Sequence, residues 1–87
     1  MKASELGAIR HRWGLTQEEL ARRIGIGRRA YITLEMGERP IRQTHILALE
    51  RVSIDICIER NDRALLLSNI RYAIDFLSED DPTEQHR

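Results

Sequence analysis

Two adjacent arginines, Arg28 and Arg29, are the residues of this 87-residue chain whose placement most needs a ligand to explain it. They follow the glycines of the segment GIGRRA, where a helix is expected to begin. The helix macrodipole already makes that end positive, so added positive charge there costs about a few tenths of a kcal/mol. The two side chains are either solvated surface residues, or an anion outside the protein compensates them. Anion binding at a helix N-terminus is the chemistry that this position suits.

The distribution of charge supports a polyanionic partner, although the net charge is zero. Residues 1–45 hold nine Lys and Arg against five Asp and Glu, whereas residues 46–87 hold five against nine. An asymmetry of this kind between halves is informative where net charge is not. The first half is therefore expected to face a polyanion while the acidic second half faces away.

The length allows one small domain with a thin core, because a chain of this size buries only about 60% of its unfolded surface. Apolar residues make up 41% and charged residues 32% of the chain, as is usual for a soluble helical protein. The single cysteine, Cys57, excludes an internal disulfide and favours a reducing cytoplasm. No apolar run approaches the ~20 residues that span a membrane, and the N-terminus lacks the apolar stretch of a signal peptide.

The spacing of apolar residues predicts an all-α fold, a compact bundle of about five helices. The capping box T-x-x-E of Thr16 and Glu19 marks the start of the second helix. An alternation of apolar residues leaves a strand over 52–58 open as an alternative to helix there. Residues 79–87 are expected to form a flexible acidic tail. The expected helices cover residues 4–13, 17–24, 28–36, 43–59 and 64–78.

Two short helices joined by a tight glycine turn form a helix-turn-helix when the spacing of their core residues is right. Gln17 opens the unit, and Ala21 follows four residues later, where a large side chain would prevent two helices from crossing closely. Gly25 comes four residues after that, at the turn. Tyr31 and Leu34 stand where they would pin the second helix to the first.

The stretch LTQEELARRIGIGRRAYITLEMGERPI resembles the Cro/phage-repressor type of helix-turn-helix proteins, often called the Xre family. The resemblance covers about residues 4–58 and rests on T-Q-E-E-L-A, I-G-I and L-E-x-G in combination. It implies a lambda-repressor-like DNA-binding domain over residues 1–60, with the motif at 17–36. The second motif helix would then enter the major groove of double-stranded DNA.

The resemblance also implies roles for individual residues. An arginine at a base-reading position of the second motif helix would pair bidentately with the O6/N7 edge of guanine. Gly27 stands where the family usually has a capping Ser or Thr, so it caps less well and removes one phosphate contact. Tyr31 replaces a usual Ile or Val, and Ile32 occupies a slot that is usually polar. The base-reading positions are Arg28, Arg29 and Thr33; the phosphate positions are Gln17, Gly27, Arg39 and Arg42; and Arg10 and Glu35 match a buried structural pair.

The expected fifth helix, within residues 61–78, carries more apolar side chains than one packed face can bury. It either packs back on the core or forms a homodimer interface. A two-fold dimer would present two recognition helices about one DNA turn apart, to match a palindrome. The residues expected at that interface are Leu66, Ile70, Ile74 and Leu77.

These observations favour a dimeric, sequence-specific transcriptional repressor that reads a palindromic operator. The resemblance implies a cytoplasmic protein on the nucleoid of a bacterial cell or a phage-infected host. The alternative is an antitoxin or protein-interaction module, whose C-terminal helix binds a partner protein instead of a second copy.

Other chemistry finds little support. GIGRRA also fits the dinucleotide pattern G-x-G-x-x-A, but that pattern needs a preceding strand and a βαβ unit, and a helix is expected before it here. His11, His45 and His86 share no metal-ligand spacing, and Cys57 has no paired base. We therefore expect no catalytic residues, no metal, no cofactor and no enzymatic activity.

Overall fold

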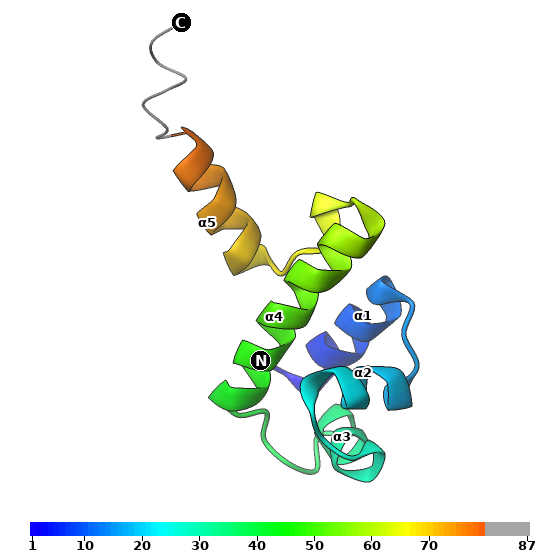
Figure 1. The fold of residues 1–87 in the computed structure, drawn as a ribbon. Coiled ribbons are helices and arrows are strands. Elements are labelled where there is room, and N and C mark those ends of the chain that lie inside the picture. The colour runs from blue at the N-terminus through cyan, green and yellow to red at the C-terminus, as the bar shows by residue number, and fades with distance from the viewer. Residues whose placement is uncertain (80–87) are drawn as a thin grey trace, which may run out of the picture.

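The computed structural model of the chain describes residues 1–79, and within them the fold is all-α (Figure 1). This confirms the predicted fold class. Helices α1 to α4 surround a single core, and α5 points away from them (Figure 1). The elements are α1 (Ala3–Trp13), α2 (Gln17–Ile24), α3 (Arg28–Glu35), α4 (Gln43–Arg60), a 3-10 turn η1 (Arg63–Leu65) and α5 (Ser68–Glu79).

The start and end of α2 follow from local hydrogen bonds. The Oγ1 atom of Thr16 accepts from the backbone N–H of Glu19 at 3.0 Å, and the carboxylate of Glu19 accepts from the backbone N–H of Thr16 at 2.9 Å. This is the predicted capping box. Gly25 ends the helix with φ of 79°, a left-handed conformation that favours glycine.

The segment 52–58 is helical, so the alternative of a strand is wrong. α4 runs without a break from Gln43 to Arg60, and Asn61 ends it with φ of 50°. Val52 and Ile56 face the core, whereas Ile58 is exposed. The apolar alternation therefore reflects a helix with some exposed apolar residues, and not the two faces of a strand.

The predicted helix over 64–78 is wrong in its first turn. The 3-10 turn η1 and an extended Leu66, with φ of −65° and ψ of 147°, precede α5. Leu65, Leu66 and Leu67 are all less than 10% exposed. Consecutive residues of an α-helix point about 100° apart, so one helical turn could not direct all three inward. Burial of this apolar run therefore breaks the helix.

The core joins the first helix to this break. Trp13 is fully buried, and its indole Nε1–H donates to the carbonyl oxygen of Leu65 at 2.8 Å. The hydrogen bond links α1 to η1 across 52 residues of sequence. It fixes the point from which α5 leaves the bundle, and the molecule is consequently elongated, with extents of 53 × 23 × 19 Å.

We predict that Trp13→Phe lowers the free energy of unfolding by about 1–3 kcal/mol, because the buried Leu65 carbonyl loses its donor. Urea unfolding followed by circular dichroism measures the change, since the variant has no tryptophan left for fluorescence. An unchanged unfolding midpoint would show that the hydrogen bond does not tie η1 to the core.

Candidate nucleic-acid interface

The packing of α2 against α3 decides which face of α3 meets solvent. Leu20 and Ala21 of α2 are buried, as are Tyr31 and Leu34 of α3. The backbone N–H of Ile26 donates to the carbonyl oxygen of Ala21 at 3.0 Å and closes the turn between the helices. The four buried side chains hold one side of α3 against the core and leave its other side outward.

The outward side of α3 carries the predicted base-reading residues. Arg28 and Arg29 are exposed in its first turn, and Ala30 beside them is exposed too. Thr33 is half-buried, and its hydroxyl donates to the carbonyl oxygen of Ala30 at 2.6 Å. The hydroxyl proton is therefore used within the helix, and the methyl group and oxygen lone pairs of Thr33 remain for an outside partner. Ile32 is half-buried.

Gly27 is the N-cap residue of α3, and no contact among residues 1–79 requires a glycine there. Its φ of −71° and ψ of 156° are ordinary for any residue. A Cβ atom built at Gly27 would meet no heavy atom within 4 Å. The position therefore leaves open space outside the first turn of α3.

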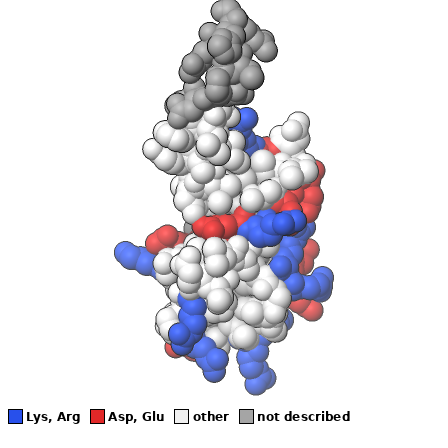
Figure 2. Space-filling model, turned by 60° about the vertical axis from the view of Figure 1, so that its left-hand side comes forward, with Lys and Arg blue, Asp and Glu red and all other residues white. Residues whose placement is uncertain are grey.

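Charge is arranged differently at the starts of helices α1 to α4. The first turns of α1 and α2 carry acidic side chains, which complement the macrodipole, whereas those of α3 and α4 carry none. Figure 2 shows Lys and Arg side chains projecting from the lower end of the molecule, which is the α3 end in Figure 1. Within residues 1–79, no carboxylate forms an ion pair with Arg28, Arg29, Arg39 or Arg42.

Other arginines of the basic half are used inside the protein. Arg23 on α2 donates twice to the Glu59 carboxylate on α4, at 3.0 and 3.1 Å. The hydrogen bonds to Glu59 raise the pKa of Arg23, and the same contact lowers the pKa of Glu59. Arg22 lies 3.8 Å from Glu18 on the same helix. These two arginines are therefore occupied in ion pairs, unlike those on α3.

A groove of about 450 Å³ separates α3 from the start of α4. The loop between the helices supplies two exposed cations to it, Arg39 and Arg42. His45 also lines it, and its Nδ1 accepts from the backbone N–H of Arg42 at 3.0 Å. The remaining lining residues are Ile26, Ala30, Leu34, Pro40 and Thr44. The groove thus continues the cationic surface beyond α3.

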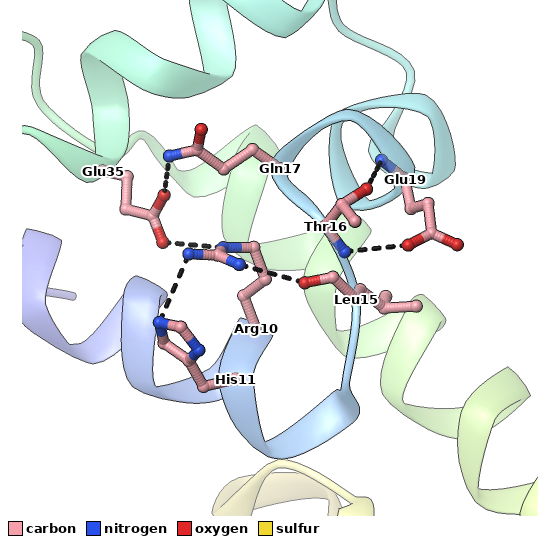
Figure 3. A network of polar contacts seen from close by, with 7 residues as sticks. All are labelled: Arg10, His11, Leu15, Thr16, Gln17, Glu19 and Glu35. Atoms are coloured by element: carbon pink, nitrogen blue, oxygen red, sulfur yellow. Dashed lines mark hydrogen bonds and ion pairs between the residues drawn. The ribbon is translucent and has the colours of Figure 1, made fainter.

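A polar network joins the first three helices (Figure 3). The guanidinium of Arg10 donates from Nε to Glu35 Oε1 at 2.9 Å and from Nη1 to the carbonyl oxygen of Leu15 at 3.0 Å. Gln17 Nε2 donates to the other carboxylate oxygen of Glu35 at 2.6 Å. The predicted Arg10–Glu35 pair is therefore present. The contact between Gln17 and Glu35 was not predicted, and it leaves one amide N–H of Gln17 for an outside acceptor.

Tyr31 lies behind this network with its ring fully buried. Its hydroxyl has no hydrogen-bond partner among the described residues. Burial raises the pKa of Tyr31 to about 12, the negative charge of Glu35 raises it as well, and Arg10 opposes both. Tyr31 therefore fills the core slot at the cost of an unsatisfied polar group.

The residues predicted for a dimer interface are not equally accessible. Leu66 is buried within the chain, whereas Ile74 and Leu77 are exposed and Ile70 is half-buried. The predicted interface set did not include Tyr72 or Phe76, whose rings stack with centroids 6.3 Å apart. The expected tail over 79–87 is wrong at its first residue, because Glu79 is the last residue of α5; His86 and the rest of the tail lie outside the described residues.

Two further classes of site are not found in residues 1–79. No group of three or more His, Cys, Asp or Glu side chains there is arranged to hold a metal ion. No helix in that part of the chain is long and apolar enough to cross a membrane.

We predict that Glu35→Gln lowers the free energy of unfolding by about 2–4 kcal/mol, because Arg10 keeps a largely buried charge without its counterion. Urea unfolding measures it. Glu38→Gln is the matched control, since Glu38 is exposed one turn away, and its effect should stay within about 0.5 kcal/mol. Equal effects of the two substitutions would contradict the role given to the pair.

We predict that Tyr31→Phe leaves the protein at least as stable at pH 7, because it removes an unsatisfied hydroxyl. The pKa of Tyr31 is raised in the folded state, so the folded state favours the neutral phenol. The contribution of this pKa difference to the free energy of unfolding is complete below pH 10 and is lost as pH rises toward 12. Unfolding of wild type should therefore become easier over that range relative to Tyr31→Phe. Tyr72→Phe, which changes an exposed ring, is the control. Parallel pH profiles of wild type and Tyr31→Phe would contradict this prediction.

Comparison with known protein families matches residues 8–52, just over half of the chain, to a helix-turn-helix family. The match includes α2, α3 and the turn between them, and it excludes η1 and α5. The searches of curated proteins and of solved structures returned no significant match. The matched family consists of DNA-binding domains of transcription regulators, not of enzymes. The chain therefore belongs to the Cro/C1-type helix-turn-helix family, also called the Xre family, and is a DNA-binding protein.

Proposed function

We propose that this protein is a transcriptional repressor that binds a palindromic operator as a homodimer and reads its bases with α3. The observation that carries the proposal is the outward side of α3, where Arg28 and Arg29 are exposed and make no ion pair within residues 1–79. An unpaired guanidinium fork matches the O6/N7 edge of guanine bidentately. Thr33 would contribute its methyl group or its hydroxyl oxygen to a neighbouring base.

Phosphate contacts would hold α3 in register with the major groove. Gln17 has one amide N–H left after its bond to Glu35, so it is suited to donate to a phosphate oxygen on one side of α3. The open space at Gly27 suits a close approach of the DNA backbone to the first turn of α3. Arg39 and Arg42, across the groove that borders α3, would bind phosphates on the other side.

A homodimer would double this interface and explain the exposed apolar side chains of α5. Two copies related by a two-fold axis read two half-sites about one helical turn apart, so the operator is palindromic. Repression would then follow from occupancy of the operator by the dimer.

The same exposed side chains of α5 support a second candidate, an antitoxin or interaction module that binds a different protein. Tyr72 and Leu77 are each more than 60% exposed and would suit either partner. Sedimentation of the purified chain at micromolar concentration separates the two. A stable homodimer supports the repressor, and a monomer supports the interaction module.

We predict that Arg28→Ala and Arg29→Ala each relax the base preference at particular operator positions, at a cost of about 1–3 kcal/mol per lost arginine–guanine contact. Gln17→Ala should instead weaken binding to all sequences alike, because a phosphate contact carries no base information. In-vitro selection from random duplex DNA at ~150 mM salt, since affinity depends on salt, measures both effects.

Arg51→Ala is the matched control for these substitutions, because Arg51 is also exposed but pairs with Asp55 on α4. It should select the same sequence as wild type. Wild-type selection by both Arg28→Ala and Arg29→Ala would refute the assignment of α3 as the base-reading element.

A further inference from the structure

The exposed part of α5 has an unusually wide apolar face. Its polar side chains Arg71, Asp75 and Ser78 share one side, where Arg71 lies 3.9 Å from Asp75. The apolar side chains cover roughly 200° of the remaining circumference at about 100° per residue. We call this surface the apolar face of α5, and it consists of Ile70, Tyr72, Ala73, Ile74, Phe76 and Leu77.

The size of this face approaches what a stable dimer buries. The exposed fractions are 71% for Tyr72, 67% for Leu77, 50% for Phe76 and 39% for Ile74. Large side chains bury about 150–250 Å² each, so these four leave roughly 500 Å² on one copy. A standard interface buries about 800 Å² per partner. The face supplies most of that area, but a further apolar surface is needed to complete it.

A groove at the base of α5 adds to this surface. It has a volume of about 500 Å³ and lies between α1 and α4. Asn69, at the start of α5, lines the groove and donates to the Glu50 carboxylate of α4. We call it the α1–α4 groove, and its other lining residues are Met1, Glu5, Ala8, Ile9, Arg12, Ile46, Leu67 and Ser68.

The groove and the apolar face form one continuous surface. Residues four and seven positions after Asn69 lie above it on the same side of a helix, and these are Ala73 and Phe76. Figure 2 shows this upper region of the molecule as mostly uncharged directly below the grey residues. An occupant of the apolar face would therefore also reach the groove.

We propose that a second copy of this chain covers this surface, with the two α5 helices packed antiparallel about a two-fold axis at Ala73. The tip of each helix, with Phe76 and Leu77, then fills the α1–α4 groove of the other copy. The inference deepens the proposed homodimeric regulator and rests on it, because it states how the two DNA-binding units are joined.

The position of Ala73 selects this axis. A residue on a two-fold axis meets its own copy, so a small side chain there lets two helices approach closely. Ala73 is the smallest side chain of the apolar face and stands midway between Asn69 and Leu77. An antiparallel pair centred on it sets Leu77 of one copy beside Asn69 of the other, which is the entrance of the groove.

A parallel pair of α5 helices would not bury the same surface. The two tips would lie beside each other, and the α1–α4 groove would stay unoccupied. In the antiparallel pair, the polar side of α5 with Arg71, Asp75 and Ser78 remains on the outside. The ion pairs of Asp75 with Arg71 and with Arg63, the latter at 3.3 Å, are therefore undisturbed.

Symmetric cross-linking tests the axis. Ala73→Cys, in a Cys57→Ser background that removes the single native thiol, should form a disulfide-linked dimer under mild oxidation, because cysteines on the axis come within the 4.4–6.8 Å Cα separation that a disulfide needs. Ser78→Cys in the same background is the matched control, since residue 78 is exposed on the polar side and should form no disulfide cross-link. Non-reducing gel electrophoresis measures both.

A mixed experiment tests the groove. Ala8→Cys and Leu77→Cys, each in the Cys57→Ser background, are oxidised together, and a hybrid disulfide between the two variants is expected. Each chain carries one thiol, so the product can form only between copies. A mixture that yields no hybrid, although Ala73→Cys cross-links, would overturn the placement of the helix tip in the groove.

The outcomes separate this inference from the proposed function. If the unmodified protein sediments as a dimer and selects a palindrome, but Ala73→Cys cross-links no better than Ser78→Cys, the antiparallel arrangement is wrong and the dimeric regulator stands. If the protein is monomeric and selects a single half-site, both fail, and a different protein covers α5. Efficient cross-linking of Ala73→Cys with retained operator binding supports both.

Discussion

The position of α3 depends on the carboxylate of Glu35. This carboxylate takes hydrogen bonds from Arg10 of α1 and from Gln17 of α2, so it ties all three helices of the DNA-binding unit at one point. α3 needs such a tie, because it has eight residues and a glycine N-cap without a side-chain hydrogen bond. A helix this short is unstable alone. Tertiary contacts of Tyr31, Leu34 and Glu35 therefore supply the stability that the local sequence of α3 lacks.

The helix N-termini differ in how their positive dipole is compensated: those of α1 and α2 by acidic side chains of the protein, and those of α3 and α4 by none, which leaves them open to an anion. Acidic side chains of α1 and α2, such as Glu5 and Glu19, complement the positive ends of their own helices. α3 and α4 begin without acidic residues and border one groove lined by Arg39 and Arg42. The zero net charge of the chain hides this separation, because Arg23 forms an ion pair within the protein, whereas the arginines on α3 form none within residues 1–79.

Local signals made α2 predictable from sequence, and the helical spacing located α4. Thr16 and Gly25 bound α2 through capping geometry that needs no tertiary information. The break before Ser68 was not predictable in this way, because it arises from burial of three successive leucines against a core that only the folded chain creates. The bond from Gln17 to Glu35 was missed for the same reason, since it joins residues 18 positions apart. The Arg10–Glu35 pair was expected only through family resemblance.

Base preference and half-site spacing are set by different parts of this chain, and the hydrogen bond from Trp13 to Leu65 belongs to the part that sets the spacing. Base preference resides in the outward side of α3, whereas the direction of α5 is fixed by η1 and the extended Leu66. In the proposed dimer, η1 and Leu66 set the distance between the two recognition helices. Substitutions within this segment would change which half-site spacing is tolerated without altering the bases that are read, so the two properties can diverge independently during evolution.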